Sequence, residues 1–214
     1  MSGSENGSFS KGFRADLADL MRWRRDVRRF RTDTVEAAVL DRCLCAFGLA
    51  PSVGLSEPWR LIRVETPEVR EKMAANYAAA NAAALAGYVD EKARIYAGLK
   101  LSGMREAPVH LAIFCDDATP KGAQLGATTM PQTRAYSVVG AITLFWLAAR
   151  AEGLGVGWVS ILDPVALHAD LTVPQGWSFI GYLCVGWPEA NHDSPELERA
   201  GWETRNPALW MESR

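Results

Sequence analysis

The feature that most constrains the fold is an apolar stretch in the middle of the chain, residues 136–152. Wound as an α-helix it is apolar on nearly every side, so it predicts a helix that other parts of the protein cover on most sides. Its uninterrupted part, residues 138–149, is well short of the ~20 apolar residues that a membrane-spanning helix needs. Gly153, Leu154 and Gly155 predict the end of this helix, and residues 156–162 predict a strand directly after it. We therefore expect a central helix enclosed by the fold and no membrane association.

Shorter elements surround that helix in an irregular order. Helices are predicted over residues 16–25, 34–49 (with Thr32 or Asp33 as its cap) and 164–170, and another should follow Thr66 and Pro67. The alanine-rich residues 69–99 predict one long helix or two broken ones, and strands are predicted over residues 61–64, 109–115 and 179–185. Because helices and strands do not alternate regularly, the order favours an α+β fold over a doubly wound sheet. We expect a disordered segment over residues 1–12 and a single domain over residues 13–214.

The composition argues against several classes of protein. The formal net charge of the 214 residues is −2, which is not the basic excess of a nucleic-acid-binding protein. The spacing of the four cysteines and three histidines matches neither a zinc site nor a disulfide framework, so we expect no metal and interpret the cysteines as buried free thiols in a reducing compartment. The N-terminus is polar and no apolar segment follows it, so we expect no secretory signal and a cytoplasmic location.

Basic residues gather in one short stretch after the first predicted helix. Its members are Arg24, Arg25, Asp26, Val27 and Arg28. The planar fork of an arginine side chain matches the oxygens of a phosphate group, so the stretch can hold one small anion. Taken alone, the stretch is better explained as the solvated basic end of a helix.

Three other motifs can bind a ligand, and each also has an ordinary structural explanation. Pro51, Ser52, Val53 and Gly54 form a small rigid loop that can approach a flat ligand, or an ordinary turn before a strand. Residues 152–160, which include Gly157 and Ser160, can present backbone N–H groups to a ligand, or form a tight connection from helix to strand. They follow a helix and enter a strand, which is the reverse of the context of a dinucleotide-binding fingerprint. Arg205 can add a cation to the anion site, or is an exposed residue of the tail.

Taken in order, these motifs resemble the nitroreductase superfamily over most of the chain, from about Met21 to Arg205. The resemblance rests on Arg24, Arg25 and Arg28, on Pro51, Ser52, Pro58 and Trp59, on the end of the apolar helix at residues 147–153, and on Arg205. Asp26 stands where ordinary members carry serine. Together with Leu101, Gly157, Ser160 and Gly201-Trp202, it makes the chain similar to the 5,6-dimethylbenzimidazole synthases of that superfamily. Glu57 departs from the pattern, in which glutamine precedes Pro58.

The resemblance implies an FMN-dependent nitroreductase fold. It implies a central, mostly antiparallel sheet flanked by helices, and an intertwined homodimer in which each flavin touches both chains. The FMN-binding residues that it implies are Arg24, Arg25, Asp26, Val27, Arg28, Pro51, Ser52, Val53, Gly54, Leu101, Gly157, Ser160 and Arg205. The implied reaction consumes reduced FMN and O₂ and yields 5,6-dimethylbenzimidazole, the lower ligand of cobalamin, and erythrose 4-phosphate. A separate flavin reductase that uses NAD(P)H would supply the electrons.

Asp26 and Ser160 are the candidate catalytic residues. Burial raises the pKa of a carboxyl group and neighbouring cations lower it. We expect the arginines to dominate, so that Asp26 is ionised at neutral pH, and we expect Ser160 at the flavin ring rather than in the core. Two other functions stay open: a conventional NAD(P)H-dependent nitroreductase or flavin reductase that recycles bound FMN, against which Asp26 argues, and a non-catalytic flavin-binding protein.

Overall fold

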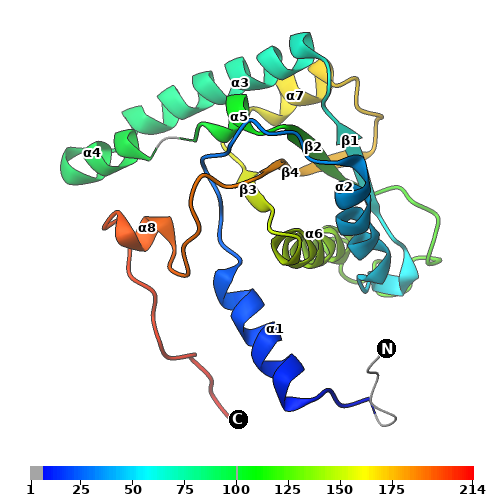
Figure 1. The fold of residues 1–214 in the computed structure, drawn as a ribbon. Coiled ribbons are helices and arrows are strands. Elements are labelled where there is room, and N and C mark those ends of the chain that lie inside the picture. Colours follow the sequence, from blue (N-terminus) through cyan, green and yellow to red (C-terminus); the bar gives the residue numbers. More distant parts are fainter. Residues whose placement is uncertain (1–6, 100) are drawn as a thin grey trace.

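A four-stranded antiparallel sheet forms the centre of the molecule (Figure 1). The structure, a computed structural model, describes residues 7–99 and 101–214. The strands are β1 (Trp59–Arg63), β2 (Val109–Asp116), β3 (Gly155–Val159) and β4 (Trp177–Gly186), in the order β1-β2-β4-β3. All neighbouring strands are antiparallel, with Leu61 opposite Ile113 and Leu111 opposite Leu183. The predicted α+β class and mostly antiparallel sheet are confirmed.

Helices cover both faces of this sheet. They are α1 (Lys11–Trp23), α2 (Ala37–Leu44), α3 (Pro67–Ala86), α4 (Asp90–Gly98), α5 (Gly103–Glu106), α6 (Thr133–Ala151), α7 (Pro164–Asp170) and α8 (Glu196–Arg199), with short 3₁₀ turns at Cys45–Leu49 and Val53–Leu55. Figure 1 shows α6 on one face and α3 and α7 on the other, with α1 and the C-terminal segment projecting from the body. Residues 1–6 of the segment predicted to be disordered lie outside the described residues, and α1 begins at Lys11.

The sheet separates two hydrophobic cores because successive residues of a strand face opposite sides. From β2, Leu111 and Ile113 join the core that contains α6, whereas Ala112 and Phe114 join the core beneath α3 and α7. A strand buried on both faces is apolar throughout, which explains the uninterrupted run of residues 109–115. On α6, the buried positions Val138, Ala141, Ile142, Phe145 and Ala149 recur every three or four residues. Tyr136 and Val139 on the same helix stay exposed, so one chain covers α6 incompletely.

Two helix starts follow the predicted capping chemistry. The hydroxyl of Thr66 accepts a hydrogen bond from the N–H of Val69 (3.4 Å), and Pro67 occupies the first turn of α3. Asp163 caps α7 in the same way, accepting from the N–H of Val165 at 2.8 Å. Side-chain oxygens satisfy backbone donors that a helix start leaves unpaired.

Other predicted boundaries were wrong. The second helix starts at Ala37 rather than residue 34, and Asp33 forms an ion pair with Arg31 instead of capping it. By contrast, the alanine-rich stretch forms two helices, α3 and α4, which confirms one of the two predicted alternatives; residues 87–89 leave the helical path between them. The strand predicted over residues 156–162 ends at Val159, so Ser160 lies outside the sheet and is exposed.

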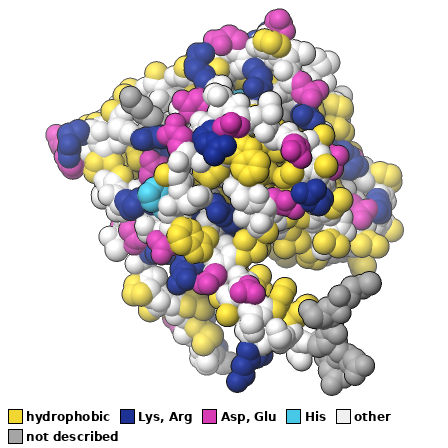
Figure 2. Space-filling model, viewed as in Figure 1, with side chains coloured by type: hydrophobic (Ala, Val, Ile, Leu, Met, Phe, Trp, Pro, Cys, Tyr) yellow, Lys and Arg dark blue, Asp and Glu magenta, His cyan; other side chains and the backbone are white. Residues whose placement is uncertain are grey.

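All four cysteines are free thiols, as predicted. Cys43, Cys115 and Cys184 are buried, but Cys45 is exposed, which corrects the expectation that all four are buried. Among residues 7–99 and 101–214, no three His, Cys, Asp or Glu side chains gather as a metal site requires. Within that same part of the chain, no helix has the length and apolar character needed to cross a bilayer. On the face that Figure 2 shows, Lys and Arg side chains are interspersed with Asp and Glu.

A buried histidine links β2 to β4. The Nδ1 atom of His110 lies 2.8 Å from the hydroxyl of Tyr182, and both residues are buried. Burial, with a smaller contribution from the positive charge of Arg70, lowers the pKa of His110 to about 3. The imidazole is therefore neutral in the folded protein over most of the acidic range.

This histidine should make stability depend on pH. In the unfolded chain it takes up a proton near pH 6.5, but in the folded chain only near pH 3, so its contribution is complete above pH 6.5 and decreases as pH falls towards 3. Between pH 7 and pH 5 this group alone should lower the free energy of unfolding by about 2 kcal/mol. Between pH 7 and pH 5, the free energy of unfolding of His110→Gln should therefore fall by about 2 kcal/mol less than that of the wild type. Urea denaturation of both proteins at both pH values measures this difference. Equal losses in the two proteins would contradict it.

Candidate active site

The segment that follows α1 is bound to the open edge of the sheet. β3 is an edge strand, and Asp26 pairs with Val156 on it in a parallel bridge. The N–H of Val27 donates to the carbonyl oxygen of Val156 at 3.0 Å, and the N–H of Trp158 donates to Oδ1 of Asp26 at 2.9 Å. Asp26 of the basic motif and Trp158 of the glycine-rich motif, 132 residues apart in the sequence, therefore belong to one structure.

Gly157 makes this approach possible. A Cβ atom at position 157 would lie 2.2 Å from the carbonyl oxygen of Val27, a distance that no side chain tolerates. Gly155 also packs closely on Val27: a Cβ atom at position 155 would lie 2.7 Å from Cγ2 of the Val27 side chain. The sequence motif suggested a backbone open to a ligand or a tight connection; at Gly157 the structure has a close contact between two backbones.

The carboxylate of Asp26 has several electrostatic neighbours. Although its side chain is only partly buried, loss of contact with water raises the pKa of Asp26 above the ordinary aspartate value, and the Trp158 N–H and Arg28 oppose that rise only in part. Nε of Arg28 is 3.5 Å from Oδ2 of Asp26, a long contact, and the nearby Glu196 carboxylate also raises the pKa. Arg25 is directed elsewhere, since its Nε donates to the carbonyl oxygen of Asp193. The expectation that the arginines would dominate the pKa of Asp26 is thus wrong in direction.

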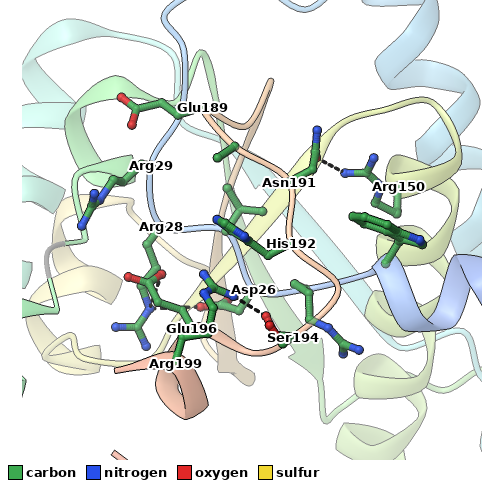
Figure 3. A pocket seen from close by; sticks show the side chains of 14 residues that line it. Asp26, Arg28, Arg29, Arg150, Glu189, Asn191, His192, Ser194, Glu196 and Arg199 are labelled. Atoms are coloured by element: carbon green, nitrogen blue, oxygen red, sulfur yellow. Dashed lines mark hydrogen bonds and ion pairs between the residues drawn. The ribbon is translucent and has the colours of Figure 1, made fainter. Parts of the chain in front are cut away.

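Asp26 borders two cavities. It keeps 38% of its side-chain surface exposed, so a molecule in either cavity can reach it. The first, here called the cationic cavity, has a volume of about 150 Å³ (Figure 3). It collects five arginines, one aspartate and two glutamates: Arg25, Arg28, Arg29, Arg150, Arg199, Asp26, Glu189 and Glu196. Positive charge exceeds negative charge there, which suits an anionic group.

The second cavity, here called the aromatic cavity, has a volume of about 230 Å³. It is lined mainly by rings and aliphatic side chains, with a few polar groups: Asp26, Arg28, Tyr77, Asn81, Tyr96, Leu99, Leu101, Trp158, Val159, Ser160, Ile161, Leu197 and Trp202. Apolar walls with a few polar groups are typical of cofactor and small-molecule sites. The volume is below the ~300–1,000 Å³ that usually holds a drug-sized ligand, so one chain encloses only part of such a ligand.

The tail brings another cation to the arginine cluster. Burial is the main cause that lowers the pKa of Arg25, and the positive charges of Arg24 and Arg205 lower it further. These three guanidinium groups are therefore electrostatic neighbours. Arg24 stacks over the Trp146 ring, 4.9 Å from its centroid. Arg205 pairs with Glu198 at 3.1 Å, and Arg28 lies 3.9 Å from Glu196, so α8 supplies a carboxylate to each of two arginines.

The loop of Pro51, Ser52, Val53 and Gly54 lies elsewhere in the same chain. The Ser52 hydroxyl accepts from the N–H of Glu57 at 3.0 Å, and the N–H of Val53 donates to the Ser137 hydroxyl of α6 at 3.1 Å. None of the four loop residues, all of them described, lines either cavity. Glu57, where the family pattern has glutamine, forms an ion pair with Lys121. The structure thus unites Asp26, Val27, Arg28, Leu101 and Ser160 at the two cavities, with Gly157 packed against Val27, but it does not bring this loop there.

Two aromatic residues of the site, Tyr77 and Tyr96, escaped the sequence analysis, and a third, Trp202, entered it only through the family resemblance. Tyr77 and Tyr96 lie in the alanine-rich stretch, which has little helical periodicity, and Trp202 lies in the proline-dotted tail. The only signal was the presence of large rings in segments otherwise poor in them. In the structure, Trp202 packs on Tyr96 of α4 and on Tyr88 in the turn before that helix.

Comparison with known proteins decides the family. The family model described as Nitroreductase family matches residues 21–187. The chain belongs to the nitroreductase family. Within this family it is 53% identical over 199 residues to the 5,6-dimethylbenzimidazole synthase of Rhodospirillum rubrum, covering 93% of this chain and 94% of that protein. It is 46% identical over 203 residues to the synthase of the same name from Rhodobacter capsulatus, covering 95% and 98%.

Solved structures agree on the fold. The crystal structure of oxidized iodotyrosine deiodinase, bound to FMN and 3-iodo-L-tyrosine, matches this nitroreductase-family chain with a TM-score of 0.71. The match covers 92% of this chain and 97% of that one, at 20% sequence identity. At that identity the likeness concerns the fold alone.

Proposed function

We propose that this protein is a 5,6-dimethylbenzimidazole synthase that fragments reduced FMN in the presence of O₂. The observation that carries the proposal is the position of Asp26. A backbone N–H of β3, that of Trp158, binds its carboxylate, which borders both the cationic cavity and the aromatic cavity. Relatives that bear the synthase name at 53% and 46% identity over nearly the whole chain support the same reaction. The products are 5,6-dimethylbenzimidazole and erythrose 4-phosphate.

The residues of the site fit FMN. Its phosphate suits the cluster of Arg24, Arg25, Arg28 and Arg205, because arginines neutralise and orient phosphate oxygens. Its flat ring suits the aromatic cavity, where Leu101 and Ser160 belong to the wall. FMN is here the substrate; when reduced, it supplies the chemistry with O₂.

Asp26 is the group that we propose moves a proton during fragmentation. Breaking the bond between the ring and the ribityl chain requires proton removal near that carbon, and Asp26 is a carboxylate that both cavities can reach. The burial that raises its pKa makes its ionised form a stronger base than an exposed aspartate. The N–H of Trp158 holds the carboxylate in one orientation. We further propose that Ser160 contacts the ring, since it is exposed and lines the aromatic cavity.

A separate flavin reductase is the proposed source of electrons. Asp26 stands where ordinary members of the family carry serine, and relatives at 53% and 46% identity bear the synthase name. The walls of the aromatic cavity would exclude bulk water and large second reactants from the reduced ring. This favours the synthase over a conventional nitroreductase that recycles FMN with NAD(P)H.

We also propose a homodimer with two FMN sites, in which the loop of residues 51–54 serves the partner's site. Three observations support it: the loop lines neither cavity of its own chain, one chain encloses only part of a ligand, and a row of apolar side chains is uncovered on α1. None of the 13 residues of α1, all described, is buried, and Phe13, Leu17 and Met21 recur every four residues on one side. An exposed apolar row of this kind marks an interaction surface.

Light scattering with flavin bound should give twice the 23.4 kDa mass of one chain. Leu17→Glu should shift the mass towards the monomer, because it puts a charge into the apolar surface buried between two chains. Val165→Glu, at an exposed valine on α7, is the matched control and should leave the mass unchanged. A monomer mass for the flavin-bound wild type would disprove the dimer.

Phosphate recognition can be tested by comparing FMN with riboflavin. Arg205→Ala should weaken FMN binding by about 2 kcal/mol, or roughly 30-fold, because a charge-assisted contact is lost and Glu198 is left facing the phosphate. Riboflavin, which has no phosphate, should bind weakly to both proteins and with equal affinity. Arg214→Ala, which removes an exposed arginine paired with Glu212, is the control. If Arg205→Ala weakened riboflavin and FMN equally, the proposed phosphate site would be wrong.

The reaction is tested by exposing the protein with bound reduced FMN to air and analysing the products. The wild type should yield 5,6-dimethylbenzimidazole and erythrose 4-phosphate. Asp26→Asn keeps the size and one hydrogen-bond acceptor but removes the base. We expect the variant to bind FMN and to consume reduced flavin with O₂, while 5,6-dimethylbenzimidazole formation falls by at least about 100-fold, the usual contribution of a positioned base.

Each alternative predicts a different result from the same experiment. A flavin-binding protein without activity returns intact FMN from the wild type. A conventional nitroreductase also returns intact FMN in air, but NADPH bleaches its bound FMN rapidly under anaerobic conditions. Near-normal product from Asp26→Asn would remove Asp26 from the catalytic step, and loss of FMN binding in that variant would reduce it to a structural partner of the arginines.

A further inference from the structure

Trp202 joins the C-terminal segment to the wall of the aromatic cavity. Its ring meets Tyr88 edge-on, with centroids 5.2 Å apart and planes at 85°, and lies 6.2 Å from the ring of Tyr96. The ammonium group of Lys92 lies over the Trp202 ring, 4.6 Å from its centroid, and also donates a hydrogen bond to the Trp202 carbonyl oxygen. Trp202 and Tyr96 both line the aromatic cavity. One tail residue thus contacts three side chains on α4 and the turn before it.

α4 depends on contacts of this kind for its position. None of its nine residues, all described, is buried, so no core side chain anchors it. A hydrogen bond also joins α4 to α3: the hydroxyl of Tyr96 donates to Oδ1 of Asn81 at 2.8 Å. Aromatic and cation–π contacts at the surface are individually weak and reversible. A wall held in this way can open to admit a ligand and close afterwards.

Trp202 also connects that wall to the arginine cluster. The backbone N–H of Trp202 donates to the carbonyl oxygen of Leu197 in α8 at 2.8 Å. Three residues further on, Arg205 pairs with Glu198 of α8 and lies in the electrostatic neighbourhood of Arg25. The same short segment therefore closes the aromatic cavity and carries a cation of the anion site.

We propose that Trp202 is a specificity-determining residue, a latch that holds the C-terminal segment on α4 and closes the aromatic cavity to any second large reactant. The inference rests on the proposed function, in which reduced FMN lies in that cavity. With the latch closed, a small oxidant such as O₂ reaches the reduced ring and a planar organic electron acceptor does not. Reduced flavin is then committed to the reaction with O₂ instead of losing two electrons to other acceptors.

The test uses the FMN-bound protein and 2,6-dichlorophenolindophenol, a planar two-electron acceptor that takes two electrons and two protons from reduced FMN and leaves oxidised FMN. Anaerobic stopped-flow measurements record bleaching of the dye at several dye concentrations. Trp202→Ala should raise the second-order rate constant by about tenfold or more, because it removes two aromatic contacts and a cation–π contact that favour the closed state. Trp202→Phe, which keeps a ring, should stay within about twofold of the wild type.

Two controls separate the latch from other effects. Trp210→Ala removes an exposed tryptophan of the same tail, bonded to Glu212, and should react with the dye at the wild-type rate. Reduced FMN that has dissociated would also bleach the dye, but at a rate that levels off with dye concentration. A rate that stays proportional to dye concentration identifies entry into the site.

The proposal is overturned if Trp202→Ala reacts with the dye at the wild-type rate, or if its faster reaction levels off at the rate of flavin release. Failure of the proposed function gives a different result. In that case wild-type protein with bound reduced FMN makes no 5,6-dimethylbenzimidazole in air, whatever the dye reveals about Trp202. Wild-type protein that binds no FMN would overturn both.

Discussion

The attachment of the Asp26 segment to β3 is the contact on which the rest of the site depends. Two hydrogen bonds, from the N–H of Val27 to Val156 and from the N–H of Trp158 to Asp26, hold the arginine motif against the edge of the sheet. The contact exists because position 157 has no side chain, so the two backbones meet where a Cβ would collide. It covers the exposed edge of β3 and fixes a carboxylate between two cavities.

The acids of α8 add a second level of organisation. Glu196 lies near Arg28 and Glu198 pairs with Arg205, so two cations of the cluster already have carboxylate neighbours without a ligand. A phosphate group must compete with these carboxylates for the arginines, which limits the net gain from binding it. Because α8 lies within the same segment as Trp202, the charge balance of the cationic cavity and the closure of the aromatic cavity are mechanically joined.

The sheet separates two hydrophobic cores, and this arrangement explains where the site lies. The core around α6 packs against one face of the sheet, whereas the aromatic cavity is lined by Trp158 and Val159 of β3 together with residues of α3, α4 and the tail. Rigid backbone on one side and weakly held helix on the other suits a reaction that must admit a large substrate and then exclude water. The apolar row on α1 and the exposed residues of α6 are further surfaces that a single chain does not cover.

The sequence by itself determined the elements whose signals are local. The continuous apolar stretch of α6, the uninterrupted run of β2 and the cap residues Thr66 and Asp163 act within a few residues, so they were predictable, as was the α+β class. The order of the arginine, Pro-Ser and glycine motifs identified the family. Local signals did not determine the start of α2, where Asp33 pairs with Arg31, or the end of β3 before Ser160.

Only the tertiary structure decided how the motifs combine. It put Gly157 against Val27, left the loop of residues 51–54 away from both cavities, and brought Trp202 onto α4. It also reversed the expected pKa shift of Asp26, because burial and the geometry of Arg25 and Arg28 are properties of the folded chain rather than of neighbours in sequence. Contacts between residues far apart in the chain depend on packing, and pKa values depend on the burial that packing creates; neither is encoded in the spacing of residues within a motif.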